Sequence, residues 1–113
     1  MENVKAGYCY NEDVEWENVA DGVRRKILCY DANLMLVLVE FKKGSIGYLH
    51  EHIHTQVSYL ISGSFEVQIG DEKKIQKAGD TYFLLPNIRH GVVALEDSSL
   101  IDVFTPVRED FLK

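Results

Sequence analysis

Short stretches that favour β-strands follow one another along most of the 113-residue chain. Residues 23–30 (VRRKILCY) and 34–41 (LMLVLVEF) are separated by the turn-forming segment Asp31-Ala32-Asn33, so they predict a hairpin. The second of these stretches is apolar at nearly every position, which predicts a strand buried on both faces. Residues 65–69 alternate apolar and polar positions, as a half-buried strand does, and the tight turn Gly70-Asp71 follows.

Short predicted strands separated by turns continue to the end of the chain. Further strands are predicted at 73–76, 81–85, 90–95 and 100–105, separated by the turns 77–80, Pro86-Asn87 and 96–99. We count seven to nine short strands and no convincing amphipathic helix, which favours an all-β antiparallel sandwich or barrel. The chain has room for one domain, residues 1–113 with a core at about 16–108. The first dozen residues and the tail after Pro106 are expected to be peripheral.

Composition and charge exclude several classes of partner. Hydrophobic residues make up 46% and charged residues 27%, as in ordinary globular proteins. The formal net charge of −6 argues against nucleic acid, because phosphate binding needs a basic stripe. No run is long and apolar enough to span a membrane, and Met1–Lys5 lacks the apolar core of a signal peptide. A cytoplasmic location is therefore expected.

The chain contains two cysteines, Cys9 and Cys29. They are far apart and form no CxxC motif, so neither a zinc ribbon nor a redox motif is indicated. We expect buried or inactive thiols in a reducing compartment.

The four histidines fall in two places, with His50, His52 and His54 together and His90 much later. His50 and His52 lie two apart, so on a strand both rings would point to the same face and converge on one ion. Gln56 and His90 are the candidates to complete the ligand set of a divalent metal. The alternative for an isolated HxH pair is two surface histidines on a hairpin. His54 fits either a role beside the pocket or plain solvent exposure.

The spacing around these histidines resembles a known family. The pattern Gly44-x5-His50-x-His52-x3-Gln56-x6-Gly63 resembles the first cupin motif, and Gly79 to His90 (GDTYFLLPNIRH) resembles the second. The resemblance implies a cupin jelly-roll barrel with one metal ion held by His50, His52, Gln56 and His90. Gln56 stands where cupins usually carry a glutamate, so this set is neutral and leaves the full charge on the ion. The ion itself is open among nickel, zinc, manganese, iron and cobalt.

Nearly the whole chain, from about Trp16 to Leu112, resembles the pectin-degradation cupins called KdgF. The segments that carry this likeness are 16–19, 22–27, 50–63 and 102–112 (DVFTPVREDFL). That family is implicated in opening the ring of 4,5-unsaturated uronate monosaccharides from pectin or alginate, which yields linear keto sugar acids. The resemblance therefore implies a small sugar acid as the partner.

The C-terminal segment supplies three candidate catalytic residues. Asp102 and Phe104 lie two apart on the last predicted strand and so share a face. If that face points into the barrel, Asp102 is a general acid/base and Phe104 an apolar wall for the sugar. Arg108 can then grip the substrate carboxylate in a bidentate pair. Taken singly, each has a simpler structural explanation: a turn cap or dimer-surface ion pair for Asp102, a core position for Phe104, and a surface ion pair for Arg108.

Two other functions stay open at this point. One is a sugar-binding or sensor cupin that keeps the metal without turnover, although the chain carries no DNA-binding domain. The other is a metal-dependent dioxygenase, which the neutral Gln56 makes the least favoured. A homodimer is expected from the small size, the sheet edges and the family resemblance. The residues Tyr48, Tyr59 and Tyr82 are further candidates for lining the pocket.

Overall fold

The computed structural model describes residues 6–113, and these residues form ten β-strands and two short 3₁₀ turns. The N-terminal segment Met1–Lys5 lies outside the described residues, so the structure does not test the prediction that this segment is not a signal peptide. The elements follow one another as η1 (Asn11–Asp13), β1 (Glu17–Ala20), β2 (Val23–Tyr30), β3 (Met35–Phe41), β4 (Ile46–His50), β5 (Thr55–Ser62), β6 (Ser64–Ile69), β7 (Glu72–Lys77), β8 (Thr81–Leu84), β9 (His90–Ala94), β10 (Ser98–Thr105) and η2 (Glu109–Leu112).

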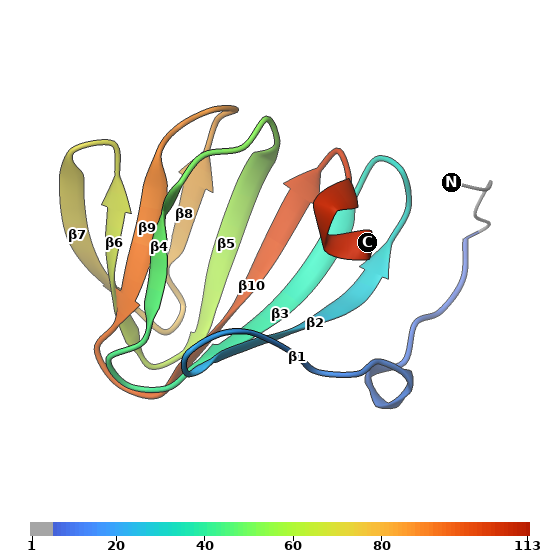
Figure 1. Ribbon diagram of the computed structural model, residues 1–113, viewed down its shortest axis with the longest axis horizontal. Coiled ribbons are helices and arrows are strands. Elements are labelled where there is room, and N and C mark those ends of the chain that lie inside the picture. The colour runs from blue at the N-terminus through green and yellow to red at the C-terminus, as the bar shows by residue number, and fades with distance from the viewer. Residues whose placement is uncertain (1–5) are drawn as a thin grey trace.

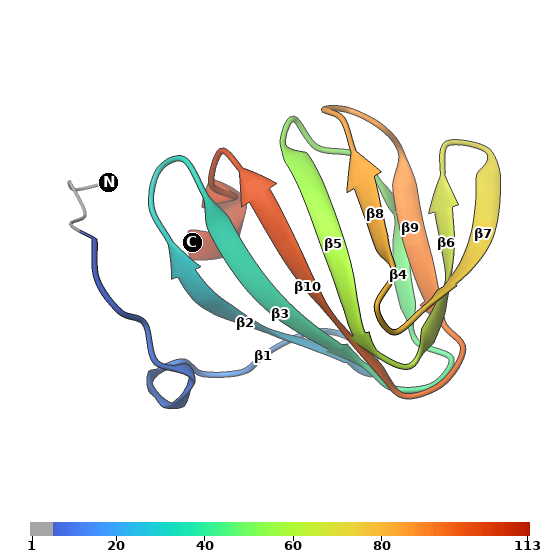
Figure 2. The same ribbon diagram turned by 180° about the vertical axis from the view of Figure 1, so that it is seen from behind.

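The strands make two antiparallel sheets, which confirms the predicted all-β class. One sheet has six strands in the order β1-β2-β3-β10-β5-β8, and the other has four in the order β4-β9-β6-β7. Figure 1 shows the two sheets as the walls of the fold, with the short C-terminal turn beside β10 and β3. Figure 2 shows the six-stranded sheet from behind, with β3, β10, β5 and β8 side by side. None of the helices among residues 6–113 is long and apolar enough to cross a membrane.

The core lies between the sheets and is built from the alternating inward positions of each strand. Phe41 from the six-stranded sheet and Phe65 from the four-stranded sheet meet edge to face with their ring centroids 5.0 Å apart. Such a pair contributes roughly 1 kcal/mol beyond the apolar area it buries. Further fully buried side chains around them include Met35, Val37, Leu60, Leu84 and Leu100.

One glycine of the predicted motif has a clear steric role. Gly63, which joins β5 to β6, has φ of 79°, and a Cβ there would lie 2.0 Å from the Ser98 hydroxyl oxygen. Any side chain would therefore combine left-handed backbone strain with a collision. This position fixes the crossing from one sheet to the other.

The seven strands predicted by residue range are confirmed within one or two residues, but the count of seven to nine was too low, since ten strands form. Two further differences concern individual strands. Residues 34–41 were expected to be buried on both faces, yet only the inward positions of β3 are buried and the outward ones are half-buried. His52 was expected on a strand with His50, yet β4 ends at His50 and His52 lies in the loop to β5. Hydrogen bonds determine the shape of this loop, and the alternation of residues used to predict strands does not predict such bonds.

The tail after Pro106 is not peripheral, because Val107 and Arg108 are both buried. The backbone N–H of Val107 donates to the carbonyl of Ala32 at 3.2 Å, which ties this segment to the loop between β2 and β3. Apolar packing of Phe111 against the core holds the last turn in place. The expectation that the chain ends in a loose tail is therefore wrong.

The expectation of two free thiols is also wrong, because Cys9 and Cys29 form a disulfide with their Cα atoms 5.9 Å apart. The N-terminal segment folds back to the exposed end of β2, and separation along the chain gives no sign of that approach. The cysteines therefore no longer support the expected reducing compartment.

Candidate metal and sugar site

Three histidines converge where β4 and β9 pair. His50, the last residue of β4, is opposite His90, the first residue of β9. His52 reaches the same point from the loop before β5. The ligand nitrogens of the three rings lie within 4.8 Å of one another, so they are positioned to bind one metal ion.

Each ring is held in the tautomer that a metal requires. The Nδ1 atoms contact backbone carbonyls two residues away: Tyr48 for His50 (2.8 Å), His54 for His52 (3.1 Å) and Ile88 for His90 (2.9 Å). A carbonyl only accepts hydrogen bonds, so each Nδ1 carries a proton, and Nε2 is the ring nitrogen that is left to bind an ion. Fixing the ring through its second nitrogen is how proteins usually orient histidine ligands.

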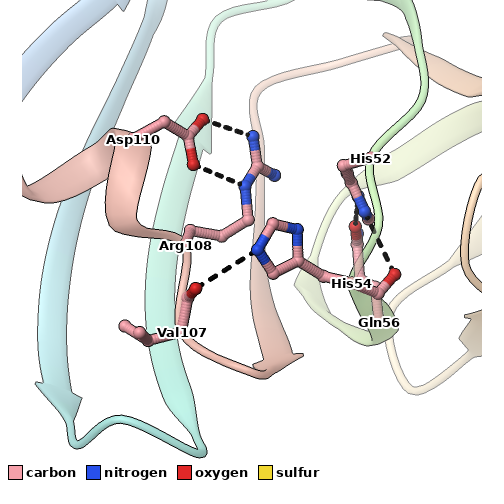
Figure 3. Close-up of polar contacts among 6 residues, drawn as sticks. All are labelled: His52, His54, Gln56, Val107, Arg108 and Asp110. Carbon is pink, nitrogen blue, oxygen red and sulfur yellow. Dashed lines mark hydrogen bonds and ion pairs between the residues drawn. The ribbon is translucent and has the colours of Figure 1, made fainter.

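Gln56 brings an amide oxygen to this cluster. Its Nε2 donates to Ser58 Oγ at 2.9 Å and to Asp102 Oδ1 at 3.1 Å, which fixes the orientation of the amide. Its Oε1 then faces His52 Nε2 at 2.8 Å, as Figure 3 shows. A cation between the two atoms would be bound by the lone pair of the amide oxygen and that of an unprotonated Nε2. The donor set of three imidazoles and one amide oxygen fits a divalent first-row metal.

Burial keeps two imidazoles of the cluster, those of His52 and His90, neutral and ready to bind an ion. Desolvation lowers the pKa of His90 to about 4, and it also lowers the pKa of His52. Both rings are therefore unprotonated at neutral pH, which metal binding requires.

A glycine that the sequence analysis did not single out brings the two strands together. A Cβ at Gly91 would lie 2.7 Å from the backbone carbonyl oxygen of Gly47 and 3.1 Å from the backbone nitrogen of Leu49. The backbone could not move away without separating β4 from β9. Gly91 therefore lets His50 and His90 approach each other, and its place directly after His90 was the available signal.

Asp102 and Phe104 point into the barrel, as their spacing predicted. Both line a cavity of about 150 Å³ between the sheets, together with His50, Gln56, Tyr82 and His90. Burial raises the pKa of Asp102 to about 6, although hydrogen bonds from Ser58 (2.5 Å) and Gln56 and the charge of Arg108 act in the opposite direction. A carboxyl group with this pKa can both accept and release a proton near neutral pH.

Ser58 was missed by the sequence analysis. It is fully buried, and it lies two residues after Gln56 on β5, so both side chains share the inward face. The separation of two residues that predicted a shared face for Asp102 and Phe104 also predicts one for Gln56 and Ser58.

Arg108 closes one side of the cavity, and it forms the ion pair that its place before Glu109 and Asp110 suggested, although Arg108 itself is buried. Its Nε and Nη2 donate to the two carboxylate oxygens of Asp110 at 3.1 and 2.8 Å (Figure 3). The guanidinium lies over Phe111 (4.2 Å) and Phe104 (5.1 Å). Since one edge of the fork is bound to Asp110, the edge formed by Nη1 and Nη2 is the one left for a ligand.

His54 is buried rather than exposed to solvent. Its Nε2 donates to the backbone carbonyl of Val107 at 3.2 Å, directly before Arg108 (Figure 3). Its ring also contacts Phe104 edge-on, with centroids 6.3 Å apart. His54 therefore links the loop that carries His52 to the segment that carries Arg108.

The three candidate tyrosines differ in whether they line the cavity. Tyr82 is buried and lines the cavity, and burial raises its pKa, so it remains a neutral phenol. Tyr48 is 70% exposed and Tyr59 lies on the outward face of β5. A larger hollow of about 660 Å³ lies at the other end of the strands, but no histidine lines it.

Comparison with known proteins agrees with this geometry. The family model described as "Cupin domain" matches residues 37–104. The chain is 50% identical over 107 residues to the pectin degradation protein KdgF of Dickeya dadantii, covering 93% of this chain and 97% of that protein.

Solved structures show the same likeness. The structure of KdgF from Halomonas sp. superimposes with a TM-score of 0.90 at 38% identity, covering 95% of this chain and 99% of that one. An RmlC-like cupin from Shewanella frigidimarina superimposes with a TM-score of 0.89 at 39% identity, covering 95% and 96%. The chain therefore belongs to the cupin family and, within it, to the KdgF group.

Proposed function

We propose that this protein opens the ring of 4,5-unsaturated uronate monosaccharides, with one divalent metal held by His50, His52, Gln56 and His90. The observation that carries the proposal is the contact of Gln56 with both His52 and Asp102. It places a carboxyl group of raised pKa next to a cluster built for a metal. The 50% identity to a protein named for pectin degradation supports a uronate as the substrate.

The reaction is an isomerisation in which one proton moves. In the cyclic substrate, C5 is joined to the ring oxygen and doubly bonded to C4, and C1 is a hemiacetal carbon. Asp102 as the carboxylate takes the proton of the C1 hydroxyl, the bond from C1 to the ring oxygen breaks, and C1 becomes an aldehyde. The ring oxygen leaves as the enolate oxygen on C5. Asp102 then returns the proton to C4, which converts the enolate into a ketone.

A divalent ion at the histidine cluster supplies Lewis-acid polarisation of substrate oxygens. The other residues hold the substrate. Arg108 offers the free edge of its guanidinium to the uronate carboxylate, and Phe104 packs against the ring. The cavity of about 150 Å³ is below the usual size of drug-binding pockets, which favours a monosaccharide over an oligosaccharide.

Proton NMR of an unsaturated monouronate is the direct test. We expect the vinyl signal of H4 to disappear faster with the metal-loaded protein than in buffer, with equal amounts of the linear product appearing. Asp102→Asn should abolish the acceleration, and Lys74→Gln, an exposed change on β7, should leave it unchanged. An unchanged rate with wild-type protein would refute the proposal, and tight sugar binding without turnover would favour a sensor.

A further inference from the structure

Three polar side chains form a row across the inward face of the six-stranded sheet. Asp102 on β10 is opposite Ser58 on β5, and Ser58 is opposite Tyr82 on β8. Figure 2 shows these three strands side by side. Ser58 is fully buried, and both Asp102 and Tyr82 line the cavity beside the histidine cluster. The phenol of Tyr82 is therefore a second group, besides the carboxyl of Asp102, that can exchange a proton with a bound molecule.

Asp102 has one oxygen free to face the cavity. Among residues 6–113, both hydrogen bonds that its side chain accepts go to Oδ1, from Ser58 Oγ at 2.5 Å and from Gln56 Nε2 at 3.1 Å. Oδ2 is therefore the oxygen left to take a proton from a ligand. A single oxygen can lie against only one end of a sugar ring.

The ring opening proposed above needs proton transfer at two opposite ends of the sugar. The proton leaves the hydroxyl on C1, whereas the proton that completes the reaction is added to C4, the ring carbon across from C1. An oxygen placed at the C1 hydroxyl reaches C4 only if the sugar turns in the site. A cavity of about 150 Å³ leaves little room for such a turn. A second proton donor beside Asp102 makes the turn unnecessary.

The phenol of Tyr82 is the group along the cavity that best fits this role. Burial raises its pKa and the charge of Asp102 raises it further, so the phenol carries its proton at neutral pH. The carbon end of an enolate is a much stronger base than a phenolate, so a phenol can protonate it. The arginines of the cavity wall do not lose a proton, and the Nδ1 protons of His50 and His90 are bound to backbone carbonyls.

We propose that Tyr82 is a catalytic residue that delivers the proton to C4 of the substrate. The inference rests on the ring opening proposed above and concerns its second half. Asp102 takes the proton of the C1 hydroxyl through Oδ2, and the bond from C1 to the ring oxygen breaks. The enolate oxygen then forms the C5 ketone, and the electron pair of the C4–C5 double bond takes the proton of the phenol. The phenolate takes up the proton that Asp102 holds, so no proton is gained or lost overall.

Ser58 links the two groups, because its hydroxyl has one proton to donate. Without substrate that proton goes to the carboxylate of Asp102, and Tyr82 also lies within hydrogen-bonding reach of Ser58. When Asp102 has become neutral and Tyr82 is a phenolate, the negative charge has moved from one side of Ser58 to the other. A hydrogen bond to a charged group is stronger than one to a neutral group, so the hydroxyl then turns to the phenolate.

Tyr82→Phe tests the role of the phenol, because it removes one oxygen and keeps the ring that packs in the cavity. We expect kcat to fall at least about 100-fold, with KM changed less than threefold because Arg108 and the histidine cluster still hold the sugar. Tyr59→Phe is the matched control and should keep the wild-type rate, since it removes a phenol oxygen from the outward face of β5. Thermal melts and metal titration check that each variant is folded and binds the metal like wild type.

The face of C4 that receives the proton gives a second readout. In heavy water, a donor fixed on one side of the sugar adds deuterium to one face of C4. Proton NMR of the early product should therefore show one of the two C4 hydrogens replaced selectively by wild type and by Tyr59→Phe. Tyr82→Phe should label both faces, because water then supplies the deuterium.

Two results would overturn the role of Tyr82. One is a Tyr82→Phe protein with kcat within threefold of wild type, and the other is a slow Tyr82→Phe protein that still labels a single face of C4. The wild-type reaction run alongside distinguishes this proposal from the one on which it rests. Without acceleration by wild type, the ring opening and the role of Tyr82 are both refuted, whereas an active wild type confines the failure to Tyr82.

Discussion

Gln56 donates an amide N–H to the carboxylate of Asp102 over 3.1 Å, and this contact explains why a glutamine stands where cupins usually have a glutamate. A glutamate would place a second carboxylate beside the half-buried Asp102, and two close carboxylates cannot easily both be ionised. The amide instead offers its oxygen to the histidine cluster and its N–H to Asp102. One side chain thus contacts both the proposed metal site and the proposed acid/base residue.

Gln56→Glu is therefore expected to change metal binding and turnover in opposite directions. The added negative charge should tighten binding of a divalent metal by at least tenfold and lower kcat by at least tenfold, because Asp102 is held protonated to higher pH. Calorimetric metal titration and the NMR assay measure the two effects. Gln68→Glu, the same change at a half-buried position on β6, is the control and should alter neither. If kcat rises together with the affinity for the metal, the explanation of Gln56 is wrong.

Removing a histidine of the cluster should remove the response of the protein to metal. Binding at 100 times Kd stabilises a folded protein by about 2.7 kcal/mol. For a domain of this size we therefore expect the metal to raise Tm by about 10 °C. In thermal melts with and without a chelator, His90→Ala should lose this difference. Glu51→Gln, an exposed change between His50 and His52, should keep it. A metal response retained by His90→Ala would show that the ion binds elsewhere.

Much of this site could be predicted from the sequence, because residues separated by an even number of positions on a strand point to the same face. Asp102 and Phe104 were placed on one inward face by their separation of two, and β10 confirms that arrangement. His50 and His90 were expected near each other, and they are paired in register. Periodicity works here because a strand fixes the direction of each side chain.

The features that could not be predicted lie in segments without a regular alternation of apolar and polar residues. His52 and His54 lie in a loop whose shape is set by hydrogen bonds to backbone carbonyls. The burial of Arg108 follows from a chain end that folds back over the barrel. No local pattern encodes such long-range contacts, and the same is true of the disulfide at Cys9.

The pH dependence of the reaction should follow Asp102. Its pKa of about 6 lies above the ordinary value of 3.8, so the carboxylate that starts the reaction forms as pH rises through about 6. The acid limb of kcat/KM is therefore expected near pH 6. Ser58→Ala removes a hydrogen bond to the charged form, which contributes about 1.5–3 kcal/mol, so the limb should move up by about one pH unit or more. Ser62→Ala, at an exposed serine of the same strand, is the control. A limb that stays in place or moves down in Ser58→Ala would contradict the assignment.

Asp110 should act on the substrate through Arg108. Its two hydrogen bonds hold the guanidinium over Phe104 and Phe111, with the free edge available to a carboxylate. Asp110→Asn weakens this hold, so the arginine samples other orientations and binds the uronate less well. We expect KM to rise about tenfold with kcat changed less than threefold, because the proton transfer at Asp102 is untouched.

The neighbouring acid provides the comparison for this prediction. Glu109→Gln removes the same charge from an exposed side chain one residue away, and it should leave both constants unchanged. A second readout reports on the arginine directly. In nitrogen-15 NMR of the sugar-free protein, rotation about the Nε–Cζ bond of Arg108 should be slow in wild type and in Glu109→Gln, and fast in Asp110→Asn. Equal rotation rates in all three proteins would show that Asp110 does not position Arg108, whatever the kinetics.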